Sequence, residues 1–168
     1  HVDIRESAYV IGNGPLLRVI AGVALGLGFR RVYLVGEDEA DLLEQKELLG
    51  RVFIGADVLT LPAHSLTLQT VGASLMVNTL PLQERPDLAA DLAYFNFMRR
   101  GGLVLDLYGF GKEQPVLEEA LRAGLRVIPA HLVSAGRDLA LLQNLKIETA
   151  SFETKYFEAW LEQAQGPS

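Results

Sequence analysis

The chain has 168 residues, of which 49% are hydrophobic, and carries a formal net charge of −6 at pH 7. An acidic chain without a basic stripe argues against nucleic-acid binding, and no apolar run reaches the roughly 18 residues of a membrane span. The absence of cysteine excludes disulfides, thiol catalysis and thiolate zinc sites. We expect a single domain of cytoplasmic location, because no signal-peptide pattern is found and one core suffices for this length.

Apolar strand-like runs alternate with helical patterns along almost the whole chain. We predict strands at residues 9–11, 31–35, 52–54, 74–77, 103–107 and 126–128. The helices predicted between them span residues 15–27, 39–49, 62–71, 87–99 and 115–123, and a glycine follows each one closely. A helix at 133–145, a strand-like run at 147–152 and a last helix at 155–163 complete the pattern.

This order of strand, short turn, helix and strand is the βαβ repeat. Because its crossovers are right-handed, the repeat builds a doubly wound parallel sheet with helices on both faces. We therefore predict a single-domain, Rossmann-like α/β fold at residues 8–163. Residues 1–7 are expected to be a tag or lead-in, and residues 164–168 a tail.

The first strand is followed at once by a glycine turn and the start of a helix. Amides that such a turn exposes favour a bound phosphate, and the helix dipole adds to the effect. The turn departs from the G-x-G-x-x-G fingerprint at its third glycine, which is Leu17 here, a side chain expected to crowd the helix against the strand. The candidate phosphate-binding residues are Gly12, Asn13, Gly14, Pro15 and Leu16. The alternative interpretation is a Rossmann-like turn without a ligand.

Acidic residues follow the second predicted strand. Glu37 and Asp38 lie about 23 residues beyond Gly14, where a carboxylate would accept hydrogen bonds from the adenosine ribose. Together with Glu39 they would repel a 2′-phosphate. If a dinucleotide binds, NAD is therefore favoured over NADP. The alternative is that Asp38 or Glu39 only caps the following helix.

Polar side chains also follow the fourth and fifth predicted strands. The carboxyl ends of parallel strands face the ligand crevice, so Asn78, Thr79 and Asp106 are candidates to border a nicotinamide ribose. The alternative for Asp106 is a carboxylate that caps a helix or organises its loop. His64 and His131 have no partner at metal-ligand spacing, so the sequence predicts no metal site.

Several segments, in unbroken order over residues 8–145, resemble the nucleotide-binding C-terminal domain of shikimate dehydrogenases. The residues at 12–18 match that family's G-A-G-G-A-x-R turn, and those at 78–82 resemble its N-A-T-P-L segment. Residues 106–117 resemble its D-L-x-Y-x-P-x-x-T-P-L-L segment, 120–127 its A-x-x-x-G-x-x-V pattern, and 131–136 echo its closing G-M-L-x-x-Q-G motif. The resemblance implies a Rossmann fold and dinucleotide binding.

The departures from the family pattern fall on positions that bear chemistry. The N-R-T that grips the NADP 2′-phosphate is replaced at residues 36–38, the Thr of N-A-T-P-L is Leu80, and the Gln of the last motif is Ala135. The Tyr of the D-L-x-Y segment falls at Gly109 unless Tyr108 substitutes for it. The family's catalytic Lys–Asp pair belongs to an N-terminal substrate domain that these 168 residues do not include. Proton transfer needs such a positioned acid or base, so we predict no catalytic residue and no activity for this chain alone.

Two hypotheses follow for function. The first hypothesis, which we favour, is a degenerate nucleotide-binding module with a regulatory or interaction role, binding another nucleotide or no coenzyme. The alternative is the NAD-binding half of an oxidoreductase of the shikimate or quinate dehydrogenase type, completed by a missing N-terminal domain. Either hypothesis allows a partner domain or a homo-oligomer.

Overall fold

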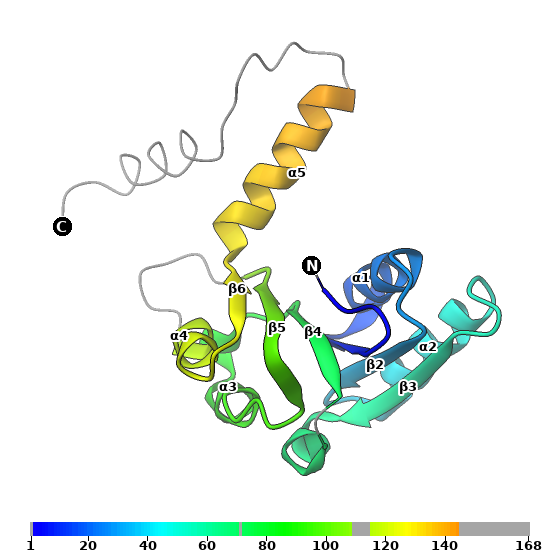
Figure 1. The fold of residues 1–168 in the computed structure, drawn as a ribbon. Coiled ribbons are helices and arrows are strands. Elements are labelled where there is room, and N and C mark those ends of the chain that lie inside the picture. The colour runs from blue at the N-terminus through cyan, green and yellow to red at the C-terminus, as the bar shows by residue number, and fades with distance from the viewer. Residues whose placement is uncertain (1, 71, 109–114, 145–168) are drawn as a thin grey trace.

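A computed structural model describes residues 2–70, 72–108 and 115–144 of the chain. The elements predicted at 147–152 and 155–163, and the predicted tail, lie outside these ranges. Within them, the predicted α/β fold is confirmed, as strands and helices alternate along the chain (Figure 1).

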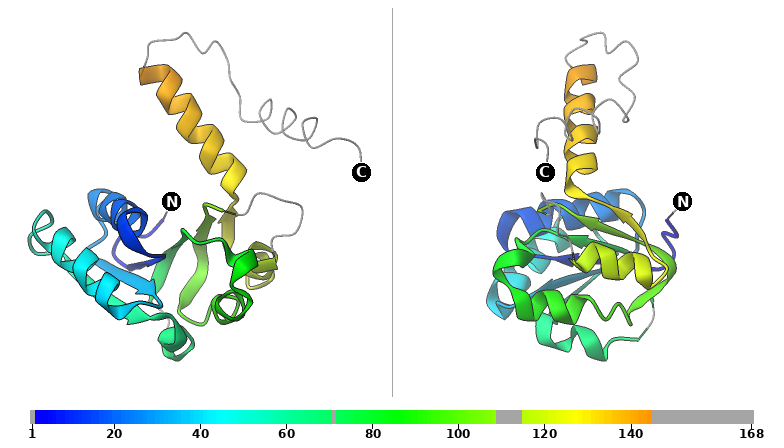
Figure 2. Two further views of the ribbon diagram at one scale, coloured as in Figure 1. Left: turned by 180° about the vertical axis from the view of Figure 1, so that it is seen from behind. Right: turned by 90° about the vertical axis from the view of Figure 1, so that its left-hand side faces the viewer.

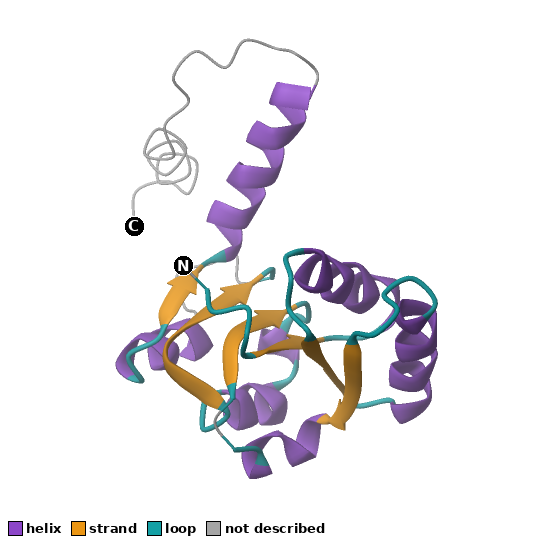
Figure 3. Ribbon diagram, turned by 45° about the vertical axis from the view of Figure 1, so that its right-hand side comes forward, coloured by secondary structure: helices purple, strands orange, loops and turns teal. Residues whose placement is uncertain are grey.

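Six parallel strands form one sheet in the order β3-β2-β1-β4-β5-β6 (Figure 1). This is the strand order of a doubly wound Rossmann fold. Figure 3 shows the strands of this sheet together with the helices around them. The strands are β1 (Ser7–Ile11), β2 (Arg31–Gly36), β3 (Asp57–Pro62), β4 (Ala73–Asn78), β5 (Met98–Asp106) and β6 (Arg126–Ile128). The order reverses at β1, so the crevice beside the carboxyl ends of β1 and β4 is where such folds bind ligands.

Helices cover both faces of this sheet (Figure 2). The α-helices are α1 (Gly14–Gly26), α2 (Glu39–Gly50), α3 (Pro86–Leu92), α4 (Pro115–Arg122) and α5 (Ala130–Asn144), and the short 3-10 helices are η1 (Ala63–Leu68) and η2 (Leu82–Glu84). Helices α1 and α2 share one core with the sheet, whereas η1, α3 and α4 share the other. Helix α5 follows β6 and extends away from the body of the domain (Figure 1).

The strand predicted at residues 52–54 is wrong. Helix α2 ends at Gly50, and the amide of Phe53 still donates to the Leu49 carbonyl, so residues 52–54 form a turn after the helix. The third strand begins later, at Asp57, whose carboxylate pairs with Arg31 on the neighbouring strand. A short apolar run cannot reveal by itself which neighbour it will pack against, and here it packs only in part.

Two predicted helices are shorter in the structure. The helix predicted at 62–71 is the 3-10 helix η1, because β3 continues to Pro62. The helix predicted at 87–99 ends at Leu92, and β5 already begins at Met98. Between Leu92 and Met98, Phe95 and Phe97 turn into the core. The ring centroids of Phe97 and Tyr9 are 4.9 Å apart. Tertiary burial of these rings therefore ends the helix that the local apolar pattern of residues 87–99 favoured.

Candidate functional site

The glycine turn predicted to hold phosphate lies between β1 and α1, at the reversal of strand order. A Cβ at Gly12 would lie 2.0 Å from Oγ1 of Thr79, so only glycine fits here. The Thr79 hydroxyl in turn donates to the Ile11 carbonyl at 2.8 Å. The space beside Gly12 is therefore filled by the Thr79 side chain of the same protein. Asn13 precedes α1 without making a side-chain cap, and Pro15 occupies the first turn.

A carboxylate from α2 already binds the amide at the start of α1. The Gly14 N–H donates to Oδ2 of Asp41 at 2.7 Å. The other oxygen of Asp41 accepts from Nε2 of Gln45 at 2.8 Å, and Oε1 of Gln45 accepts from Arg18 at 2.8 Å. Gln45 is buried, and this chain of hydrogen bonds joins α2 to α1. A negative charge at a helix N-terminus is stabilised by the amides there, as a phosphate would be.

Sequence reasoning missed Asp41. It lies in the first turn of α2, where an acidic residue is ordinary, and its partner Gly14 is 27 residues away along the chain. The only local signal was that Asp41 is a fourth acidic residue, shortly after the acids at 37–39.

Leu17, at the third fingerprint position, lies beneath α1. Its side chain is fully buried in the core that α1 and α2 share with the sheet, which also holds Ala8 and Val10 of β1. It does not line the crevice beside the glycine turn. The leucine therefore contributes to packing and leaves the crevice open.

The two acids predicted to reach a ribose have partners within the protein. Asp38 caps α2, because its Oδ1 accepts from the amides of Ala40 at 2.9 Å and Asp41 at 3.2 Å. This is the helix-capping alternative for Asp38. The Glu37 carboxylate forms an ion pair with Arg85, which precedes α3.

The polar residues at the ends of β4 and β5 form a buried network. Asn78 and Asp106 stand level in the sheet register, and Nδ2 of Asn78 donates to Oδ1 of Asp106 at 3.0 Å and to the Leu80 carbonyl at 2.7 Å. Oδ1 of Asn78 accepts from the Leu80 amide, and Asp106 also accepts from the Tyr108 amide. Asn78, Thr79 and Asp106 are all buried. Asp106 therefore organises its loop.

An open crevice remains beside the glycine turn, with a volume of about 590 Å³. This size suits a small-molecule ligand. Its charged lining consists of Asp38, Asp41 and Arg85. The remaining lining residues are Asn13, Gly14, Pro15, Leu16, Thr79, Leu80, Pro81 and Tyr108.

Most of the predicted site residues meet at this crevice. Six of them line it: Asn13, Gly14, Pro15, Leu16, Asp38 and Thr79. The other four predicted residues, Gly12, Glu37, Asn78 and Asp106, are not part of its lining. The glycine turn therefore borders an open space, whereas Asn78 and Asp106 are buried and do not line it.

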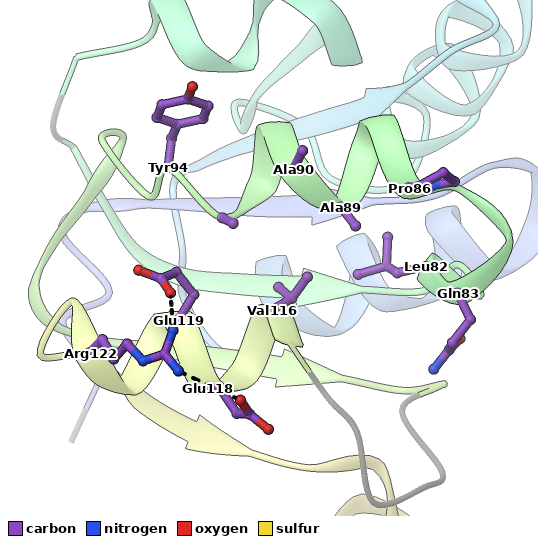
Figure 4. A pocket seen from close by; sticks show the side chains of 11 residues that line it. Leu82, Gln83, Pro86, Ala89, Ala90, Tyr94, Val116, Glu118, Glu119 and Arg122 are labelled. Atoms are coloured by element: carbon purple, nitrogen blue, oxygen red, sulfur yellow. Dashed lines mark hydrogen bonds and ion pairs between the residues drawn. The ribbon is translucent and has the colours of Figure 1, made fainter.

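A larger pocket, of about 880 Å³, lies between α3 and α4 (Figure 4). These helices pack on the face of the sheet opposite to α1 and α2. Small side chains line the pocket, among them Ala89 and Ala90, and its charged rim is internally paired. Arg122 binds Glu119 at 2.8 Å and lies 3.9 Å from Glu118. This pocket is remote from the glycine turn.

The described residues contain neither a metal-binding cluster nor a membrane-spanning helix. No group of three or more His, Cys, Asp or Glu side chains there is placed to hold a metal ion. None of the helices in that part of the chain is both long and apolar enough to cross a bilayer.

Comparison with solved structures finds shikimate and quinate dehydrogenases. Shikimate 5-dehydrogenase from Thermus thermophilus, in complex with shikimate, is 20% identical with a TM-score of 0.69; the match covers 99% of this chain and 57% of that one. Quinate dehydrogenase from Corynebacterium glutamicum, in complex with NAD, is 15% identical with a TM-score of 0.60, covering 74% and 44%. A shikimate 5-dehydrogenase from Mycobacterium fortuitum is 26% identical with a TM-score of 0.57, again covering 74% and 44%.

These similarities establish the fold that the sequence motifs predicted. No protein-family model matches the chain. No curated protein matches it significantly. The chain spans about half the length of the solved structures described above.

Proposed function

We propose that this chain is a Rossmann module of the shikimate dehydrogenase type that has lost the usual grip on a dinucleotide and has a regulatory or interaction role. The observation that carries the proposal is the hydrogen bond from the Gly14 amide to Asp41. In a dinucleotide-binding Rossmann fold the amides at this turn hold the pyrophosphate. Here a carboxylate of the protein holds one of them.

Electrostatics supports the same proposal. A diphosphate entering the crevice would approach Asp41 and Asp38, and among the described residues that line it Arg85 is the only basic one. Arg85 is already paired with Glu37. Two like charges 4 Å apart repel by about 4 kcal/mol at an effective dielectric constant near 20. Each acid that stays ionised beside the diphosphate therefore weakens binding substantially.

The alternative function is the NAD-binding half of an oxidoreductase completed by a separate substrate domain. Two observations favour it: the crevice is open, and similar folds occur in a quinate dehydrogenase in complex with NAD. The chain also spans about half of the solved dehydrogenases. In this alternative the acids at 37–39 would favour NAD over NADP.

Calorimetric titration of the whole chain with NAD, NADH, NADP and inorganic pyrophosphate tests the proposal. We expect no heat of binding from the three dinucleotides with the wild type, and pyrophosphate binding no tighter than about 1 mM. Asp41→Ala frees the Gly14 amide and removes one charge, and should bind pyrophosphate at least about tenfold more tightly, which corresponds to about 1.4 kcal/mol. Asp41→Asn separates the two effects, because it removes the charge but keeps an acceptor.

Glu44→Ala is the matched control. It removes the same charge from an exposed position on the same helix, outside the crevice lining, and should leave pyrophosphate binding unchanged. Micromolar binding of NAD by the wild type, lost in Gly14→Leu, would contradict the proposal and establish the alternative. Equal pyrophosphate affinities of Asp41→Ala and Glu44→Ala would show that Asp41 does not block phosphate binding at the Gly14 amide.

A further inference from the structure

Helix α1 is apolar on its outer side as well as its inner side. Its inner residues, such as Leu17 and Ala21, pack on the sheet. Its outer residues Leu16, Val19 and Val23 are exposed, and so is Leu27, which directly follows the helix. The four residues recur at the spacing of one helix face. A helix that is hydrophobic all round is ordinarily buried on all sides. The exposed stripe runs along most of this 13-residue helix, or about 20 Å.

The turn after α2 enlarges this apolar surface. Phe53 lies against α1, with its ring 3.6 Å from where a Cβ at Gly22 would stand. The neighbouring side chains point into solvent instead: Val52 is 71% exposed and Ile54 is 93% exposed. We call Leu16, Val19, Val23, Leu27, Val52 and Ile54 the α1 patch. Exposed apolar side chains gathered on one helix and the turn beside it are typical of an interaction site.

We infer that the α1 patch binds a second copy of this chain, with the two α1 helices antiparallel across a two-fold axis. The chain has a net charge of −6, so two copies repel one another except where an approach brings neutral surfaces together. Helix α1 offers such a surface. Its one charged residue, Arg18, is held by Gln45.

The charges at the two ends of α1 select the antiparallel arrangement. Exposed Asp38 and Glu39 flank its N-terminal end, where Asp38 shares the crevice with Pro15 and Leu16. Glu37 beside them is already paired with Arg85. Exposed Arg30 and Arg51 lie at the other end, next to Phe29 and Val52. A two-fold axis across the helix places the arginines of each copy toward the acids of the other, whereas a parallel pair would oppose like charges.

Sedimentation velocity and light scattering of the whole chain test this inference. We expect a dimer at about 100 µM, and a dissociation constant at least about tenfold higher for Val23→Glu, because the glutamate would be buried without a partner. Leu121→Glu is the matched control. Leu121 is 57% exposed on α4, close to the 54% of Val23, but on the other face of the sheet. Ile54→Asp provides a second variant in a turn, where helix stability plays no part.

Single cysteines test the geometry, because the chain contains no cysteine of its own. Residues near the axis should cross-link to their own copy on oxidation, so Val19→Cys or Val23→Cys should form disulfide dimers and Leu121→Cys should not. A wild-type monomer at about 100 µM, or a dimer that survives both Val23→Glu and Ile54→Asp, would overturn the inference. Self-cross-linking of Leu16→Cys as efficient as that of Val23→Cys would overturn the antiparallel arrangement. These measurements use no nucleotide, so they are decided independently of the titrations.

Discussion

Asn78 illustrates how a residue suited to bind a ligand can serve the fold instead. An asparagine at the carboxyl end of a central parallel strand is placed to contact a ligand. In this protein its amide group is buried and makes three hydrogen bonds, to both the carbonyl and the amide of Leu80 and to Asp106. Its side chain therefore fixes the loop after β4 and ties that loop to β5.

We predict that Asn78→Ala lowers the free energy of unfolding by about 2–4 kcal/mol, because it leaves buried polar groups without partners. Urea denaturation measures this change. Asn96→Ala is the control, since the exposed amide of Asn96 also donates to two carbonyls, those of Thr67 and Gln69. Water can replace those bonds, so the control should cost less than about 1 kcal/mol. An equal loss in both variants would contradict a buried network.

At the scale of elements, α2 begins where its sequence predicts and positions the carboxylate that closes the glycine turn. Asp38 accepts hydrogen bonds from two first-turn amides, which sets the start of the helix at Glu39. Asp41 then lies in that first turn and reaches the Gly14 amide. The cap and the contact between helices are therefore coupled through a single turn.

We predict that Asp38→Ala destabilises the protein by about 1 kcal/mol, the usual cost of losing a cap, and that Asp38→Ser recovers most of this loss. Thermal unfolding measures both values. Glu39→Ala, which removes an exposed acid from the next residue, should change stability by less than about 0.5 kcal/mol. If Asp38→Ser loses as much stability as Asp38→Ala, the charge of Asp38 and not its capping hydrogen bonds stabilises the protein.

The elements that the sequence predicts poorly share a physical cause. Residues 52–54 have the composition of a buried strand, yet Val52 and Ile54 lie in solvent. Residues 87–99 have helical spacing, yet the chain leaves the helix so that Phe95 and Phe97 enter the core. In each case a ring packs against a distant segment, Phe53 beside Gly22 of α1 and Phe97 on Tyr9 of β1, and this contact outweighed the local preference.

For the whole molecule, the central sheet couples stability to pH through Tyr9. This residue is on β1, the strand at which the order reverses, and its ring stacks on Tyr33 at a centroid distance of 4.4 Å. Burial raises the pKa of the Tyr9 phenol above its ordinary value, and the neighbouring Tyr33 adds to the shift. The unfolded chain therefore loses this proton at lower pH than the folded chain does.

It follows that the contribution of Tyr9 to stability is complete below about pH 10 and is lost as the pH rises further. We predict that wild type loses about 1.4 kcal/mol per pH unit relative to Tyr9→Phe above about pH 10, until the folded pKa is reached. Urea denaturation between about pH 8 and pH 11 measures this difference. Tyr94→Phe, which removes an exposed hydroxyl, is the control. A pH-independent gap between wild type and Tyr9→Phe would contradict the argument.

The amino-acid sequence determined the fold class of this protein, an α/β fold with a doubly wound parallel sheet. Alternating strand and helix patterns, with a glycine turn after the first strand, are local signals, and right-handed crossovers leave few ways to assemble them. Only the tertiary structure decided which partners the candidate site residues have and which apolar side chains are exposed. The bond of Gly14 to Asp41 and the pair of Glu37 with Arg85 join residues 27 and 48 positions apart. The exposure of Val23 and Ile54 likewise depends on which segments fold over them, and no local pattern records that.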